Sequence, residues 1–272
     1  MTRSLLSTPS LALLSYSWRN GFSYADLPVR MEIGSNLMIN RLARILRGRS
    51  LAELASVTFK TLVSALPSER RAEAEHLAAN RSFDERWGTD TADIMRMSAL
   101  DFPVHMARQC VAYEPSRPEI IEEITSLLTI DPADFTLVDI GSGKGMVVIC
   151  AAIQGFRRTL GLEFSQELIV IARNNASLVA KQTTLNAIPE FTQGDAREFE
   201  APGGPLLLYL YNPFGKTILN AFLDRVEASA RRDQRPIYLA YANPHWEEVI
   251  NGRECWSKIA AGSDLKIFEL KG

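Results

Sequence analysis

The sequence predicts an α/β protein with a doubly wound, mostly parallel seven-stranded sheet and an N-terminal helical extension. Two observations predict this fold class. From residue 135 onward, short apolar runs alternate with helical patterns, as they do where strands and helices wind into a parallel sheet. Residues 1–80 lack this alternation and place apolar residues at helical spacing. We therefore expect a helical extension over 1–80 and an α/β domain over 81–272.

The composition is ordinary for a globular protein in water, with 46% hydrophobic and 23% charged residues. The formal net charge of -2 offers no overall basic field, so nucleic acid is not expected as a partner. Cys110, Cys150 and Cys255 match neither a metal site nor a disulfide framework, and we expect no metal. No run approaches the roughly 18 apolar residues of a membrane span, and we expect a cytoplasmic protein.

Amphipathic patterns at 35–47 and 51–66 predict two helices in the extension, and Pro67 with Ser68 predicts the start of a third, ending near Ala79. The first pattern places arginines opposite its apolar face. We interpret them as a solvated cationic face of a small bundle; an element that binds a membrane surface or a polyanion is the alternative.

Two polar stretches follow the extension. Residues 81–92 include a Gly-Thr-Asp-Thr run, which is a poor helix interior and a good loop. Residues 113–116, Tyr-Glu-Pro-Ser, are a second loop signal, and Pro118 can begin a helix that ends near Thr129. Both stretches are connectors into the first strand or parts of a lid over a ligand bound just downstream.

A glycine-rich turn follows the first expected strand, 135–140. Asp139 lies near the end of this strand, and Gly141, Gly143 and Gly145 then occupy three alternate positions before an apolar helical stretch. Glycines allow a tight turn and a close approach of the backbone to a ligand. The helix that follows directs its free N–H groups at that ligand.

Two familiar nucleotide-binding patterns do not fit this turn. Met146 stands where the dinucleotide fingerprint requires its third glycine. No G-x-x-x-x-G-K-[ST] phosphate loop surrounds Lys144. The turn therefore predicts a different nucleoside ligand, with an ordinary Gly-rich turn between strand and helix as the alternative.

Six more strands are expected, at 159–163, 190–195, 205–211, 236–242, 255–259 and 265–270, the last two as a closing hairpin. Ligands of such sheets bind beyond the carboxyl ends of the strands. Glu163 ends the second strand, where a carboxylate can accept two hydrogen bonds from a ribose diol. Asp195 ends the third expected strand and can accept from the exocyclic amine of adenine; a polar turn is the alternative.

The pattern Asp-x-Gly-x-Gly-x-Gly resembles motif I of the class I S-adenosylmethionine-dependent methyltransferases, and the resemblance covers roughly residues 81–270. It implies a Rossmann-like fold and S-adenosylmethionine as cofactor, with the glycine loop at the methionine part, Glu163 at the ribose and Asp195 at the adenine. The cofactor-binding residues that we expect are Tyr113, Glu114, Asp139, Gly141, Ser142, Gly143, Gly145, Glu163, Phe164, Asp195, Ala196 and Asn212.

A closer similarity links this chain to the non-SET histone-lysine methyltransferases. It rests on the glycine loop and on three segments, 113–119 (Tyr-Glu-Pro-Ser-Arg-Pro-Glu), 163–165 (Glu-Phe-Ser) and 212–215 (Asn-Pro-Phe-Gly). This chain departs from that family at Pro213 and lacks its long basic nucleosome-binding tail. A histone is therefore not implied as the substrate.

Asn212, Pro213 and Phe214 are the expected catalytic residues, because they look like the Asn/Asp-Pro-Pro-aromatic motif of amino methyltransferases. An amide oxygen and a backbone carbonyl can hold an N–H donor with its lone pair toward the methyl group, while the aromatic ring walls in the acceptor. A plain strand-ending Asn-Pro turn is the alternative, since a second one follows at 243–244. His245 and Glu114 are candidate bases.

We therefore expect an S-adenosylmethionine-dependent methyltransferase that acts on an amine nitrogen of a small molecule or a protein. A methyltransferase-like binding protein without turnover is the first alternative. An NAD(P)-dependent oxidoreductase is the second, and Met146 disfavours it.

Overall fold

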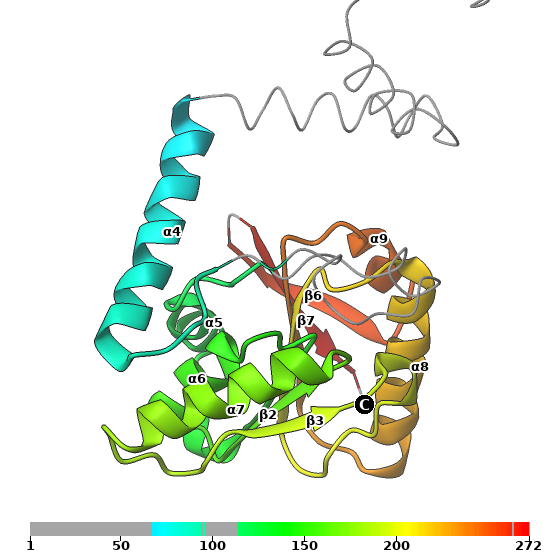
Figure 1. The fold of residues 1–272 in the computed structure, drawn as a ribbon. Helices are drawn as coiled ribbons and strands as arrows, with labels where there is room; N and C mark the ends of the chain where they lie inside the picture. The colour runs from blue at the N-terminus through cyan, green and yellow to red at the C-terminus, as the bar shows by residue number, and fades with distance from the viewer. Residues whose placement is uncertain (1–66, 94, 96–113, 263, 272) are drawn as a thin grey trace, which may run out of the picture. The chain divides into compact units, whose positions relative to one another are not determined.

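The computed structural model describes residues 67–93, 95, 114–262 and 264–271 (Figure 1). They belong to one compact unit, Pro67–Gly272. The helices expected at 35–47 and 51–66 lie outside the described residues, so the helical extension and its boundary at residue 80 stay predictions. Among the described residues, no helix is long and apolar enough to cross a membrane. The cytoplasmic location also stays a prediction.

The seven-stranded sheet has the strand order β3-β2-β1-β4-β5-β7-β6. Five strands are parallel, and β7 pairs in the antiparallel sense with both β5 and β6. The strand order reverses between β1 and β4, which is where ligands bind in sheets of this kind. The predicted fold class is confirmed. The strands are β1 Thr136–Ile140, β2 Arg158–Glu163, β3 Glu190–Gln193, β4 Leu206–Tyr211, β5 Ile237–Ala242, β6 Trp256–Ala261 and β7 Leu265–Leu270.

Helices cover both faces of the sheet, and each face has its own core (Figure 1). Successive residues of a strand point to opposite faces. Leu137 of β1 thus packs with α5, α6 and α7, whereas Val138 packs with α8. The helices are α5 Ile120–Leu128, α6 Met146–Ile153, α7 Gln166–Ala180, α8 Lys216–Arg232 and α9 Glu247–Asn251, with short 3₁₀ helices η2 Pro132–Asp134 and η3 Ala196–Glu198.

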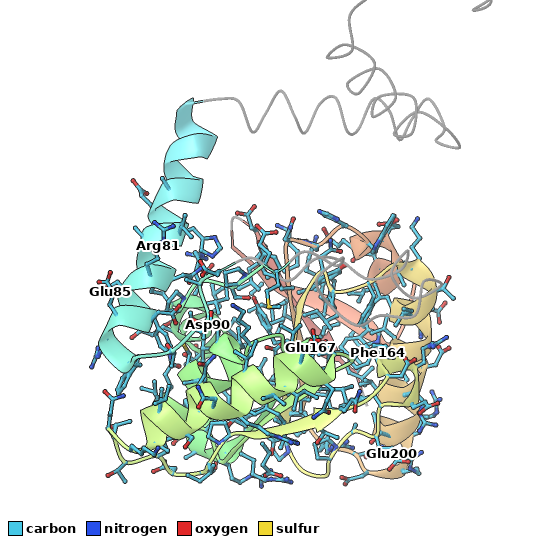
Figure 2. All side chains as sticks on the ribbon, viewed as in Figure 1. Arg81, Glu85, Asp90, Phe164, Glu167 and Glu200 are labelled. Carbon is cyan, nitrogen blue, oxygen red and sulfur yellow. The ribbon has the colours of Figure 1, made fainter. Side chains whose placement is uncertain are left out.

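The helix expected to end near residue 79 is longer in the structure, where α4 spans Pro67–Trp87. The loop prediction for 81–92 is wrong up to Trp87 and holds from Gly88 (φ 70) onward. Phe83 and Trp87, one turn apart, are buried in the core, and this burial outweighs the polar composition of the segment. Arg81 and Glu85 lie on the exposed side of the same helix (Figure 2).

Candidate active site

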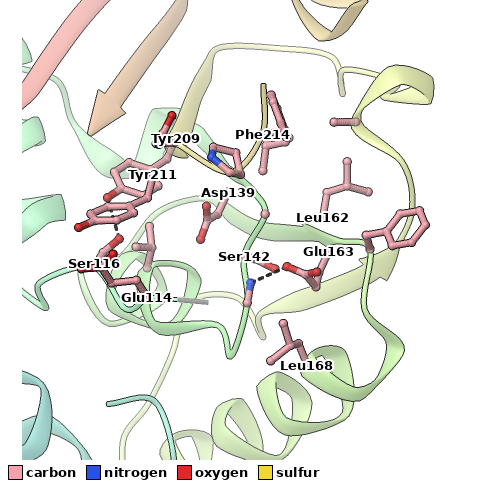
Figure 3. Close-up of a pocket in the computed structure, with 18 of the residues that line it drawn as sticks. Glu114, Ser116, Asp139, Ser142, Leu162, Glu163, Leu168, Tyr209, Tyr211 and Phe214 are labelled. Atoms are coloured by element: carbon pink, nitrogen blue, oxygen red, sulfur yellow. Dashed lines mark hydrogen bonds between the residues drawn. The ribbon is translucent and has the colours of Figure 1, made fainter. Parts of the chain in front are cut away.

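A pocket lies at the carboxyl ends of β1, β2, β4 and β5, around the point where the strand order reverses (Figure 3). It gathers segments that are far apart in the sequence. Tyr113 lies outside the described residues, and Gly145 is not part of the lining. The other predicted site residues all line the pocket: Glu114, Asp139, Gly141, Ser142, Gly143, Glu163, Phe164, Asp195, Ala196, Asn212, Pro213 and Phe214.

The glycine loop has a left-handed backbone at each of its three glycines. The φ angles of Gly141, Gly143 and Gly145 are 83°, 52° and 88°, which residues other than glycine rarely adopt. The N–H groups of Gly141 and Ser142 both donate to the carbonyl oxygen of Leu162, at 2.8 and 3.1 Å. The loop is thereby fixed to the end of β2.

Gly145 has a packing role in addition to its turn geometry. A Cβ atom here would lie 2.7 Å from the ring of Phe191 and 3.1 Å from the Cβ of Ala172. The third glycine therefore lets the start of α6 approach β3 and α7 closely. This explains its identity without a contact to a ligand.

Asp139 and Glu163 form a pair of buried carboxylates at the ends of adjacent strands. Their exposed fractions are 4% and 7%. The Oε2 atom of Glu163 accepts from the N–H of Gly143, and its Oε1 atom accepts from the N–H of Ser165, both at 2.9 Å. Glu163 thus ties the glycine loop to the N-terminus of α7. With Phe164 as a third N–H donor, the carboxylate keeps acceptor capacity for one more donor from a ligand.

Burial raises the pKa of both carboxyl groups. For Asp139 the pKa lies well above its ordinary value, first because of burial and then because of the neighbouring Glu163 carboxylate. The pKa of Glu163 is raised by burial, against the opposing effect of the N–H donors from Ser165, Gly143 and Phe164. Among the described residues, no donor forms a hydrogen bond with the side chain of Asp139, which points into the pocket (Figure 3).

Asp195 is already engaged by a neighbour. Its Oδ1 atom accepts from the backbone N–H of Arg197 at 2.8 Å and from Arg197 Nε at 3.0 Å, and these bonds lower its pKa. The adenine contact stays a prediction, in which Asp195 would accept hydrogen bonds from Arg197 and from the adenine amine at the same time. Beside it, apolar side chains line the pocket and offer a slot for a flat ring: Leu162, Phe164, Leu168 and Ala196.

The amide of Asn212 is held on both sides by protein groups. Its Oδ1 atom accepts from the hydroxyl of Tyr241 at 3.2 Å, and its Nδ2 atom lies 2.6 Å from His245 Nδ1. With Nδ2 as donor, a neutral His245 ring carries its proton on Nε2. That tautomer cannot accept a proton at Nε2, which weakens His245 as a candidate base.

Phe214 lines the pocket but is largely part of the core. It is 7% exposed, and its ring centroid lies 6.5 Å from that of Phe222. The ring is therefore a fixed wall rather than a mobile cover. Glu114, the other candidate base, is exposed at the pocket.

Four polar lining residues were not among those predicted: Ser116, Tyr209, Tyr211 and Asn243. The hydroxyls of Ser116 and Tyr209 lie 2.8 Å apart, and burial raises the pKa of Tyr209 well above its ordinary value. A signal was present, because Tyr209 and Tyr211 alternate in an otherwise leucine-rich strand and so share a face. Asn243 has the same Asn-Pro signal as Asn212.

The segment after α4 is fastened behind the glycine loop. Asn175 of α7, fully buried, bonds to the backbone N–H and C=O of Asp90, both at 3.0 Å, and to the C=O of Lys144 at 3.1 Å. The Nζ atom of Lys144 donates to Asp90 Oδ1 at 2.6 Å. Figure 2 labels Asp90 at this position. Residues 88–92 do not line the pocket, so they form a support rather than a lid.

No protein-family model matches the sequence, and no curated protein matches it. Solved structures that are similar include a magnesium protoporphyrin IX methyltransferase from Synechocystis with bound S-adenosylmethionine (17% identity, TM-score 0.45, 57% of this chain and 79% of that one). An RNA methyltransferase from Salinibacter ruber with S-adenosyl-L-homocysteine is another (21%, 0.40, 57% and 92%). A predicted N6-adenine-specific DNA methylase from Listeria monocytogenes is a third (15%, 0.44, 58% and 52%). At these low sequence identities, a proposal for the function has to be argued from the residues of the pocket.

Proposed function

We propose that this chain is an S-adenosylmethionine-dependent methyltransferase that transfers a methyl group to an amine nitrogen of a small molecule or a protein. One observation carries the proposal. Asp139 and Glu163, two buried carboxylates, lie side by side beside the glycine loop and the N-terminus of α6. This arrangement favours a ligand that combines a nucleoside with positive charge.

The charges distinguish the candidate cofactors. Buried carboxylates without a cation are costly, and a ligand cation relieves that cost. S-adenosylmethionine carries an ammonium and a sulfonium, whereas the pyrophosphate of NAD would bring negative charge toward Asp139 and Glu163. The glycine loop and the remaining acceptor capacity of Glu163 suit a methionine backbone and a ribose hydroxyl.

The charges that line the pocket as a whole support an amine as the acceptor. Lining carboxylates number four (Glu114, Asp139, Glu163 and Asp195), and in the part of the chain that the structure describes no Lys or Arg lines the pocket. Such a lining disfavours a phosphate backbone, which proteins usually hold with Lys and Arg. An amine or ammonium fits it.

The residues after β4 would align the acceptor. When bound, S-adenosylmethionine supplies a methyl group activated by its positive sulfur. Asn212 Oδ1, with one lone pair used by Tyr241, has a second lone pair for an acceptor N–H. Holding the nitrogen in line with the methyl carbon is then the main task of the site. A neutral amine becomes a methylammonium by this transfer, so the step itself consumes no base.

Titration calorimetry tests the cofactor. We expect S-adenosylmethionine and S-adenosylhomocysteine to bind with one site per chain and NAD to show no binding at the same concentration. Binding of NAD alone would support the oxidoreductase alternative and refute the proposal. Labelled-methyl transfer to the protein and small-molecule fractions of a cell lysate then separates an enzyme from a binding protein without turnover.

A further inference from the structure

Two Asn-Pro turns lie next to each other at the pocket, one after β4 and one after β5. The two strands are parallel neighbours in which Tyr211 pairs with Ala242, so Asn212 and Asn243 are the next residues of each strand. Both asparagines have left-handed backbone, with φ 43° and 45°, and both line the pocket. Asparagine adopts a left-handed backbone more readily than most residues other than glycine. The two turns therefore share one conformation and bring two asparagines to the same pocket.

Each asparagine is bonded to a tyrosine of the neighbouring strand. Tyr241 of β5 donates its hydroxyl to Asn212 Oδ1 at 3.2 Å. Tyr211 of β4 is hydrogen bonded by the side chain of Asn243, a contact that lowers the pKa of Tyr211 against larger opposing effects. This crossed arrangement orients both amides at the acceptor end of the pocket. Asn243 thus has a tyrosine neighbour that orients it, as Asn212 has.

The charges around Asn243 are mostly negative. Burial raises the pKa of Tyr211 to about 12, and the carboxylates of Glu114 and Asp264 contribute to the rise. The backbone N–H of Asn243 donates to the C=O of Asp264 at 2.7 Å. The guanidinium of Arg117 acts in the opposite direction on Tyr211, but it is ion paired with Glu123 at 2.7 Å. A cation is the ligand group that these surroundings stabilise.

We propose that Asn243, Tyr211 and Glu114 form a second acceptor subsite, which binds a protonated amine other than the nitrogen that receives the methyl group. The Asn243 amide oxygen and the Glu114 carboxylate accept hydrogen bonds from this ammonium, while Tyr211 orients the amide. The acceptor is then a diamine or a longer molecule with two amino groups. The inference rests on the proposed function, in which Asn212 aligns the methylated nitrogen.

Calorimetry on the full chain, first saturated with S-adenosylhomocysteine, tests the subsite. Three matched probes are titrated: 1,4-diaminobutane, butylamine, which lacks one amine, and 4-aminobutanoate, in which a carboxylate replaces one terminal CH₂NH₂ group. We expect the diamine to bind about tenfold more tightly than butylamine, because a charged hydrogen-bonded contact is added. The aminobutanoate should bind most weakly of the three.

Two substitutions at position 243 sharpen the test, since glycine and aspartate both tolerate the left-handed backbone. Asn243→Gly should lose the preference for the diamine, and Asn243→Asp should keep or increase it. Both should bind S-adenosylhomocysteine within about twofold of the unmodified chain, which also shows that they fold. Asn186→Gly, in the loop before β3 at the opposite edge of the sheet, is the matched control and should change neither affinity.

The outcomes separate this inference from the proposed function. Failure of the chain to bind S-adenosylhomocysteine overturns the proposed function before any amine is added. Normal binding of S-adenosylhomocysteine with no preference for the diamine over butylamine overturns the subsite alone. A preference that persists in Asn243→Gly also overturns it.

Discussion

Gly141 and Pro213 meet where the strand order reverses, so that a Cβ atom on Gly141 would lie 2.7 Å from the Cβ of Pro213. The glycine belongs to the loop after β1, and the proline belongs to the turn after β4. The loop assigned to the cofactor and the turn assigned to the acceptor are therefore in direct contact. A substitution in the loop should therefore also shift the turn, and a substitution in the turn should shift the loop.

Gly141→Ala tests this contact. The added methyl group meets Pro213 and also forces alanine into a φ of 83°. Gly88→Ala is the matched control, because its φ is 70° but a Cβ there meets nothing within 4 Å. We expect Gly88→Ala to lose roughly 1–2 kcal/mol of unfolding free energy from backbone strain alone. Gly141→Ala should lose more in urea unfolding and should lower methyl transfer; equal losses would contradict a steric role for Pro213.

Glu163→Gln tests the bridge between the glycine loop and α7. A carboxylate accepts from both Gly143 and Ser165, whereas an amide places an NH₂ group against one of these N–H donors. We expect S-adenosylhomocysteine to bind more weakly by roughly 1–3 kcal/mol, measured by calorimetry. Glu190→Gln, at an exposed carboxylate of β3, is the control. Unchanged affinity of Glu163→Gln for S-adenosylhomocysteine would show that Glu163 does not contribute to cofactor binding.

Asp139 should make stability depend on pH. Burial, and then the Glu163 carboxylate, raise its folded-state pKa above the ordinary value of 3.8. The folded chain then holds this proton more tightly than the unfolded chain, so this group lowers stability as the pH rises from 3.8 through the folded pKa. Asp139→Asn should raise the Tm of the cofactor-free protein at neutral pH and reduce its fall with pH.

The same substitution should weaken the binding of S-adenosylmethionine about tenfold, because it removes a carboxylate that would face the positive charge of the cofactor. Asp134→Asn, exposed just before β1, is the control for both measurements. A lower Tm in Asp139→Asn, or full affinity for S-adenosylmethionine, would contradict this account of the pair.

Tyr241→Phe tests how Asn212 is positioned. It removes the hydroxyl that donates to Asn212 Oδ1 and leaves the ring in place. We expect kcat for labelled-methyl transfer to fall about tenfold while the Kd of S-adenosylhomocysteine is kept, since the lost bond is worth roughly 1 kcal/mol or more. Tyr238→Phe, on the same strand, is the control. A loss of cofactor affinity in Tyr241→Phe would place Asn212 in the cofactor half instead.

Strands β1, β4 and β5 could be predicted from the sequence because each is a short apolar run with a polar or glycine residue at or just after its end. The end of α4 could not, since the burial of Phe83 and Trp87 against the core depends on tertiary contacts. Local propensity favoured a loop there, and packing decided otherwise.

The cofactor half of the pocket could largely be assembled from the sequence, because Asp139, the glycine loop and Glu163 follow consecutive strands. The acceptor half depends on which strands are neighbours. Only the pairing of β4 with β5 brings Asn243 beside Asn212 and Tyr241 within reach of it. For that reason the second Asn-Pro, which in the sequence counted against a function for the first, now supports one.

Asn175 has a consequence for how short this protein can be made. Both N–H donors of its amide and one lone pair of its oxygen bond to Asp90 and Lys144, and Asp84 of α4 in turn accepts from Thr89, Thr91 and Ala92. A truncation that starts after residue 92 would remove both Asp90 bonds from this fully buried amide, which would keep only its bond to Lys144, and would remove the Asp90 contact of Lys144 behind the glycine loop. We therefore expect the smallest piece that folds alone to include part of α4, and so to begin before the domain boundary at residue 80 that the sequence pattern predicts.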